Sequence, residues 1–124
     1  MSNAIPLKNQ VIWLTGASSG IGEALAENLA PLCTHLYISA RSAEKLSHLE
    51  NAFSNITAIA ADITDEASLA AAVAQIQSEA GRLDTVIANA GTCEYVDVNQ
   101  FDTALFRRVL ETNVLGLVNT VGAA

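Results

Sequence analysis

Short apolar runs alternate with helix-like segments along the whole chain, and this alternation restricts the folds that the sequence can adopt. The runs are rich in β-branched and aromatic residues, which is typical of buried strands, and apolar residues recur at helical spacing between them. The predicted strands span residues 10–15, 35–39, 56–60 and 83–88, and the predicted helices span residues 20–32, 42–53, 64–80 and 99–124. This order predicts a doubly wound, Rossmann-like α/β fold with a parallel sheet of about four strands.

The composition fits one compact domain and excludes several classes of protein. The chain has 124 residues, of which 51% are apolar and 15% charged, so a core is expected rather than disorder. The net charge is −7 and the six basic residues form no run, which argues against a nucleic-acid partner. No apolar run reaches the roughly 20 residues of a membrane span. We expect one domain over residues 1–124 that binds neither nucleic acid nor membrane.

The cysteines and histidines indicate no metal site. Cys33 and Cys93 lack metal-ligand spacing, and His35 and His48 do not complete a cluster. Each cysteine is interpreted as a small buried hydrophobe in a reducing compartment. Because the start of the chain also lacks the features of a secretory signal, a cytoplasmic location is expected.

Three glycines separate the first predicted strand from the first predicted helix, where the sequence reads TGASSGIG. A strand, a glycine turn and a helix N-terminus together present backbone N–H groups to a phosphate. On this interpretation Gly16 permits a tight turn, Gly20 lets the backbone approach a pyrophosphate, and Gly22 lets the helix lie close to the strand. The predicted cofactor-binding residues of this stretch are Gly16, Ser18, Ser19, Gly20, Ile21 and Gly22. An ordinary tight turn is the alternative, since the glycine pattern alone is weak evidence.

Four motifs in order resemble those of the short-chain dehydrogenase/reductase family. The glycine stretch is similar to the TGxxxGxG motif of that family, and Asn89, Ala90 and Gly91 are similar to its NAG motif. Asp62 in AADIT resembles the family's adenine-contacting Asp, and Asn113 in LETNVLG resembles its catalytic-helix Asn. The resemblance covers essentially the whole chain.

The resemblance implies roles for two of these motifs. The Asp62 carboxylate would accept from the adenine amino group and the backbone N–H of Ile63 would donate to the ring, although Asp62 could instead only cap the next helix. Asn113, which is unfavourable in mid-helix, would hold a water in the proton relay. Cys93 and Glu94 could line a substrate mouth, but a plain loop is the favoured interpretation.

The NAG-like stretch would hold the end of the fourth strand. The resemblance implies that Asn89 ties neighbouring strands together, with Thr15 helping to hold the same strand end. Ala90 and Gly91 would leave room for the cofactor ribose.

The end of the second strand bears on the choice of cofactor. A carboxylate there would favour NAD by bonding the ribose 2′-OH, but this chain has Arg41 and Ser42 in the stretch SARS. A guanidinium offers a planar fork to a 2′-phosphate, and a serine adds a hydroxyl. NADP(H) is the predicted cofactor and NAD(H) the alternative, in which Arg41 only stacks on adenine.

The family's catalytic Tyr-x-x-x-Lys signature is absent from this sequence. The only tyrosines, Tyr37 and Tyr95, are followed four residues later by Arg41 and Asn99. Family members use the Tyr as general acid or base, a nearby Lys to lower its pKa and a Ser to orient the substrate. The chain is therefore interpreted as the inactive, cofactor-binding N-terminal half of an NADP(H)-dependent oxidoreductase, a domain incomplete on its C-terminal side, whose substrate is a small carbonyl or alcohol compound.

A non-catalytic module that binds a dinucleotide, or only itself, is the alternative function. A sheet that ends at the fourth strand has an unpaired edge, so homo-oligomerisation is expected through that edge, the last helix, or both. In the family, the last helix commonly contributes to a dimer interface. A mononucleotide-binding site is disfavoured because the glycine stretch has no P-loop lysine.

Overall fold

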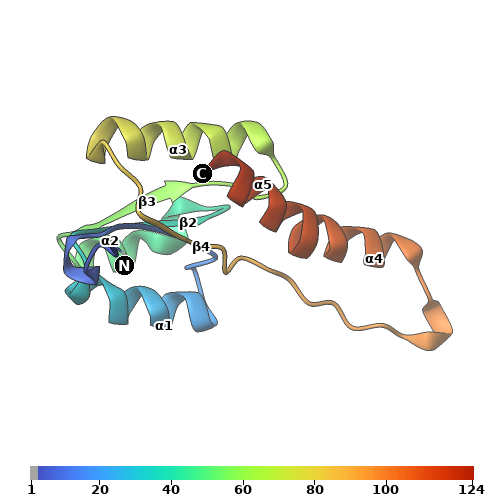
Figure 1. Ribbon diagram of the computed structural model, residues 1–124. Helices are drawn as coiled ribbons and strands as arrows, with labels where there is room; N and C mark the ends of the chain where they lie inside the picture. The colour runs from blue at the N-terminus through green and yellow to red at the C-terminus, as the bar shows by residue number, and fades with distance from the viewer. Residues whose placement is uncertain (1–2) are drawn as a thin grey trace.

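One parallel four-stranded sheet forms the centre of the molecule in the computed structural model, which describes residues 3–124 (Figure 1). The spatial order of the strands is β3-β2-β1-β4, so the chain winds outward from β1 in one direction and then returns to the other side of β1. The strands are β1 (Val11–Thr15), β2 (His35–Ala40), β3 (Ile56–Ala60) and β4 (Thr85–Ile87). All four predicted strands and the doubly wound parallel sheet are confirmed, although β4 is shorter than predicted.

Helices cover both faces of this sheet. They are α1 (Gly20–Leu29), α2 (Ser47–Ala52), α3 (Glu66–Ala80), α4 (Thr103–Leu110) and α5 (Gly116–Ala123). One core cluster joins the sheet to α1 and α2 through Ala26 and Leu49, and the other joins it to α3 through Leu69 and Ile76. Figure 1 shows α1 below the sheet and α3 above it. The side chains of β1 alternate between these clusters, so both faces of the strand are buried, as its continuous apolar sequence predicted.

Three predicted helices have different boundaries. The first ends at Leu29 and continues as a 3₁₀ turn (Ala30–Leu32) that contains Pro31, which has no N–H for a further α-helical bond. The second is a 3₁₀ turn (Ala43–Leu46) followed by the short α2. The third begins at Glu66, because the Asp65 side chain accepts a hydrogen bond from the backbone N–H of Ala67 and caps α3.

The last predicted helix begins later than expected and contains an irregular turn. A 3₁₀ turn (Val98–Gln100) comes first, and Asp102 then caps α4 by accepting from the N–H of Ala104. A π-helical turn (Glu111–Leu115) joins α4 to α5. In Figure 1, α5 lies beside the sheet and α4 extends away from it. Within the described residues α4 has no buried side chain, so most of its apolar face is open to a partner.

Candidate functional site: a glycine-lined hollow at the carboxyl ends of the strands

A hollow of about 690 Å³ lies where the carboxyl ends of the strands meet the N-terminus of α1. Ligands in doubly wound sheets bind at this place, between the two strands where the chain reverses its direction of winding. Twelve of the predicted site residues line the hollow: Gly16, Ser18, Ser19, Ile21, Gly22, Arg41, Asp62, Ile63, Asn89, Ala90, Gly91 and Asn113. Gly20 and Ser42 are the two that do not.

Gly16 and Gly22 let the backbone segments at the base of the hollow come together. Gly16 has a φ of +72°, and a Cβ there would lie 2.6 Å from Cα of Ala90. A Cβ on Gly22 would collide with the carbonyl oxygen of Gly16 and lie 2.6 Å from Nδ2 of Asn89. The expectation that Gly22 brings the helix close to the strand is thereby refined: its close neighbours are the turn at Gly16 and the Asn89 side chain.

Gly20 opens α1 with a φ of +58°, and no atom lies within 4 Å of the place where its Cβ would be. Ser19 precedes it as the N-cap residue but makes no capping hydrogen bond with its side chain. The first N–H groups of a helix have no acceptor within the helix, and the helix dipole makes this end positive. The border formed by Ser18, Ser19 and the start of α1 is thus suited to a negatively charged group.

Thr15, at the end of β1, ties the glycine turn to the segment after β4. Its Oγ1 accepts from the backbone N–H groups of Asn89 and Ala90, both at 3.1 Å. The Asn89 side chain donates in return to the carbonyl oxygen of Gly16 at 3.2 Å. The expected holding of this strand end by Thr15 and Asn89 is therefore present, and it closes one side of the hollow.

Asp62 lies in an Asx turn between β3 and α3. Its Oδ1 accepts from the Thr64 backbone N–H at 3.0 Å and from the Thr64 hydroxyl at 2.7 Å. These hydrogen bonds, together with the nearby positive charge of Arg41, hold the pKa of the Asp62 carboxyl below its usual range. The cap of α3 is Asp65, so the alternative that Asp62 caps this helix is wrong.

Arg41 borders the hollow at the end of β2, and Ser42 follows it outside the lining. The Arg41 side chain is exposed and forms no salt bridge with any residue in the range 3–124. Ser42 precedes the 3₁₀ turn but makes no capping hydrogen bond with its side chain. An unpaired guanidinium and an ionised carboxylate therefore share one end of the hollow.

Asn113 lies in the π-helical turn and forms two hydrogen bonds with the loop after β4. Its Oδ1 accepts from the Thr92 backbone N–H at 2.7 Å, and its Nδ2 donates to the Thr92 carbonyl oxygen at 2.8 Å. Single π-helical turns are frequent at functional sites. Both ends of this side-chain amide are hydrogen-bonded to the backbone of one residue, Thr92, a contact that was not predicted from the sequence.

The model of the protein family described as short chain dehydrogenase matches residues 10–124. This chain belongs to the short-chain dehydrogenase family. The family consists of oxidoreductases that bind NAD(P). The glycine-lined hollow fits such a group because the N-terminus of α1 and the unpaired guanidinium of Arg41 border it.

Relatives with known names and structures agree with this assignment. "Dehydrogenase/reductase SDR family member 7" of Mus musculus is 35% identical over 121 residues, which cover 91% of this chain and 36% of that protein. "Cis-4-hydroxycyclohexanecarboxylate dehydrogenase" of Sinomonas cyclohexanicum is 36% identical, over 87% of this chain and 45% of that protein. A short-chain type dehydrogenase/reductase from Mycobacterium marinum superposes with a TM-score of 0.90 at 26% identity, over 96% of this chain and 50% of that structure. The chain thus spans half or less of these relatives.

One ion pair at the hollow, between Arg108 and Glu94, was not predicted from the sequence. Arg108 of α4 contacts both carboxylate oxygens of Glu94, at 2.9 and 3.3 Å, and both residues line the hollow. Glu94 lies in an irregular loop, as interpreted, and the ion pair holds this loop against α4. Cys93 and Glu94 both line the hollow. Cys93 is exposed beside it, so the prediction that this cysteine is buried is wrong. The separation of 14 residues across an irregular loop gives no sequence signal for this contact.

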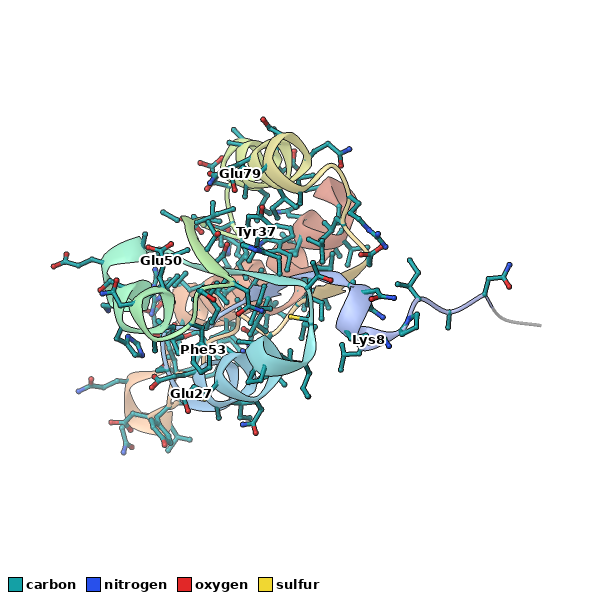
Figure 2. The ribbon with its side chains drawn as sticks, turned by 90° about the vertical axis from the view of Figure 1, so that its left-hand side faces the viewer. Lys8, Glu27, Tyr37, Glu50, Phe53 and Glu79 are labelled. Carbon is teal, nitrogen blue, oxygen red and sulfur yellow. The ribbon has the colours of Figure 1, made fainter. Side chains whose placement is uncertain are left out.

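A second hollow, of about 1020 Å³, lies at the amino ends of the strands and lacks the features of the first. Neither a glycine turn nor a helix N-terminus borders it; its wall includes Tyr37, whose hydroxyl donates to Glu79 at 3.1 Å (Figure 2). Neither Tyr37 nor Tyr95 lines the glycine-lined hollow. Among the described residues there is no group of side chains that could hold a metal ion, and no helix has the length and apolar character to cross a membrane.

Proposed function

We propose that this chain is the cofactor-binding part of an NADP(H)-dependent oxidoreductase that acts on a carbonyl or alcohol substrate. The observation that carries the proposal is the convergence of the glycine turn, Asp62, Arg41 and Asn89 around one hollow. The bound dinucleotide would supply hydride chemistry at its nicotinamide. The chain's own residues bind and orient it.

The pyrophosphate is assigned to the start of α1. The N–H groups of this helix end and the hydroxyls of Ser18 and Ser19 would face the two phosphates, with Gly20 leaving space for their approach. Ala90 and Gly91 would lie against a ribose. Ile21 would contact the cofactor from the first turn of the helix.

The adenosine end is assigned to the neighbourhood of β2 and β3. The Asp62 carboxyl is ionised at neutral pH, and its lowered pKa favours the ionised form further, so it is an acceptor for the adenine amino group. Ile63 would donate its backbone N–H to the ring. Arg41, which has no salt-bridge partner among residues 3–124, and Ser42 would hold the 2′-phosphate.

We further propose that residues outside this chain complete the catalytic apparatus. The sequence contains no Tyr-x-x-x-Lys, and the pKa of Tyr37 is raised to about 12 by burial and by the Glu79 carboxylate, which is opposite to what a general base needs. The isolated chain, regarded as one domain incomplete on its C-terminal side, would bind cofactor without turnover, and Asn113 would serve the proton relay of the complete enzyme. The free thiols of Cys33 and Cys93 are compatible with the reducing cytoplasm.

Self-association is the second candidate function, with or without cofactor binding. The observation that favours it is a row of exposed apolar side chains on α4 and α5, which include Leu110, Leu117, Val118 and Val121. Contiguous exposed apolar side chains on a protein surface are typical of interaction sites. Self-association is compatible with cofactor binding, and sedimentation velocity of the chain tests it.

Calorimetric titration of the chain with NADPH and NADH tests the cofactor assignment. We expect tighter binding of NADPH, and we expect Arg41→Ala to weaken NADPH binding about 10- to 100-fold while NADH binding changes little, because charged hydrogen bonds to the 2′-phosphate are lost. Arg107→Ala is the matched control, since it removes the same charge from an exposed residue outside the hollow. Equal affinities for NADPH and NADH would contradict the NADP(H) preference. No binding of either would contradict the assignment of the site to this chain.

A further inference from the structure

The peptide between Ile63 and Thr64 is held at both of its polar ends. Its N–H, from Thr64, donates to Oδ1 of Asp62 at 3.0 Å. Its carbonyl oxygen, from Ile63, accepts from Nδ2 of Asn119 at 3.1 Å. Asn119 belongs to α5 and lies 56 residues further along the chain, so a distant helix holds this turn.

The same face of α5 also carries Gly116, one turn before Asn119, and the side chain of Ile63 lies against it. A Cβ on Gly116 would be 2.6 Å from Cδ1 of Ile63. Thr120, which is buried beside them, turns its hydroxyl back to the Gly116 carbonyl at 2.8 Å and so competes with neither contact. The backbone of α5 can therefore approach closely enough for Asn119 to reach the Ile63 carbonyl.

The other hydrogen bonds of this turn are local. The Asp62 backbone N–H donates to Ser68 of α3 at 3.0 Å, and the Asp65 N–H donates to the Asp62 carbonyl at 3.0 Å. These contacts shape the turn but join it only to the helix that follows it. Asn119 instead joins it to α5, which approaches the hollow from a different part of the chain.

We infer that Asn119 is a positioning residue for recognition of the adenine base. This inference rests on the proposed function, in which the Asp62 carboxylate and the Ile63 N–H read the two polar atoms on one edge of adenine. The hydrogen bonds from Asn119 and to Asp62 restrict rotation of the peptide that follows Ile63. The Ile63 N–H lies on the preceding peptide, one residue away, so this restraint limits how far it can turn relative to the Asp62 side chain. Both hydrogen bonds to the Asp62 carboxylate end on Oδ1, so among the described residues Oδ2 is available to the base. A preorganised pair of groups discriminates between bases more sharply than a mobile pair.

The test compares the affinity for NADPH with that for its hypoxanthine analogue. Hypoxanthine replaces the amino group of adenine by an oxygen and the ring acceptor by an N–H, so both proposed hydrogen bonds are lost. We expect the wild-type chain to bind NADPH at least about 10-fold more tightly than it binds the hypoxanthine analogue. The ratio of the NADPH affinity to the analogue affinity should fall about 3- to 10-fold, toward one, in two variants. These are Asn119→Ala and Asn119→Asp, of which the second keeps the side-chain shape but lacks the N–H donor.

The ratio separates positioning from general damage, because a destabilised fold weakens binding of both dinucleotides together. Asn28→Ala is the matched control: the Asn28 amide also donates to a main-chain carbonyl, that of Ala24 at 2.7 Å, but away from the hollow, and the ratio should stay at its wild-type value. Circular dichroism shows whether each variant is folded. If Asn119→Ala is unfolded, the affinities of Asn119→Asp are used for the test. A wild-type ratio of one, or an unchanged ratio in the folded Asn119 variants, overturns the inference and leaves dinucleotide binding intact. Failure of the wild-type chain to bind NADPH contradicts the proposed function and the inference with it.

Discussion

At the scale of single residues, the base of the hollow depends on glycines, because the segments there are too close together for a Cβ atom. Gly22 has an ordinary negative φ, so its importance is steric: the Gly16 carbonyl and the Asn89 amide fill the space of a Cβ. Both neighbours are themselves fixed, because Asn89 is bonded to Thr15 as well as to Gly16. Neither neighbour can move aside without breaking the hydrogen bonds that join Asn89 to Thr15 and Gly16.

Gly22→Ala should therefore destabilise the chain by about 1–3 kcal/mol, the usual cost of overpacking a closely packed site. Urea denaturation followed by circular dichroism measures the change in the free energy of unfolding. Gly122→Ala is the control, since no atom lies within 4 Å of its Cβ position, and its stability should stay within about 1 kcal/mol of wild type. Equal stabilities for the two variants would show that the contact at Gly22 relaxes freely.

At the scale of elements, one hydrogen bond joins β2 to the end of α3. The Tyr37 hydroxyl donates to the Glu79 carboxylate at 3.1 Å (Figure 2). Gln75 donates to the other oxygen of this carboxylate, also at 3.1 Å. The Tyr37 side chain is only 2% exposed. Burial and the adjacent carboxylate both disfavour the phenolate, which raises the pKa of Tyr37 from 10.0 to about 12.

This shift predicts a loss of stability in alkaline solution. Between pH 10 and about 12 the unfolded chain releases the Tyr37 proton while the folded chain keeps it, so stability falls as pH rises through this window. Loss of the Tyr37 proton lowers the free energy of unfolding by at most about 1.4 kcal/mol per pH unit in this window. Denaturation at several pH values should show that Tyr37→Phe lacks this part of the slope. Tyr95→Phe, which changes a side chain that is 95% exposed, should keep the wild-type slope, and identical slopes for wild type and Tyr37→Phe would contradict the assignment.

At the scale of the whole molecule, two surfaces lack a partner. Among residues 3–124, β4 is an edge strand that pairs with β1 alone, and α4 and α5 expose an apolar face. Val118 and Val121 are 60% and 63% exposed on this face. Exposed strand edges and apolar helix faces both promote association between copies.

We expect the chain to self-associate, and we expect the double substitution Val118→Lys with Val121→Lys to shift it toward monomer by placing two charges on the apolar face. Sedimentation velocity at increasing concentration measures the effect. Leu32→Lys is the control, because Leu32 is also 54% exposed but lies after α1, away from α5. A wild-type chain that sediments as a monomer at high concentration would contradict the proposal. Association that persists in the double variant would assign the contact to another surface, such as the β4 edge.

The sequence by itself determined the layout of the fold, because periodicity is a local property. The apolar run before Thr15 and the glycines after it predict a buried strand, a turn and a helix without reference to any other part of the chain. Asp62, Asn89 and Asn113 were predicted as site residues because they resemble motifs of the family, and all three line the hollow. Asp62 and Asn89 come together there because the carboxyl ends of parallel strands lie at one edge of the sheet. Irregular turns were harder to predict: the 3₁₀ turn at Pro31 and the π-helical turn around Asn113 depend on packing as well as on residue type.

Only the tertiary structure decided which distant residues of the chain meet in and beside the hollow. Asn113 reaches Thr92 across 21 residues, Arg108 reaches Glu94 across 14, and Asn119 reaches Ile63 across 56. None of these pairs has a characteristic spacing, because each depends on the angle at which the last helix crosses the ends of the strands. That angle follows from contacts such as Gly116 against Ile63, which form only when distant parts of the chain come together.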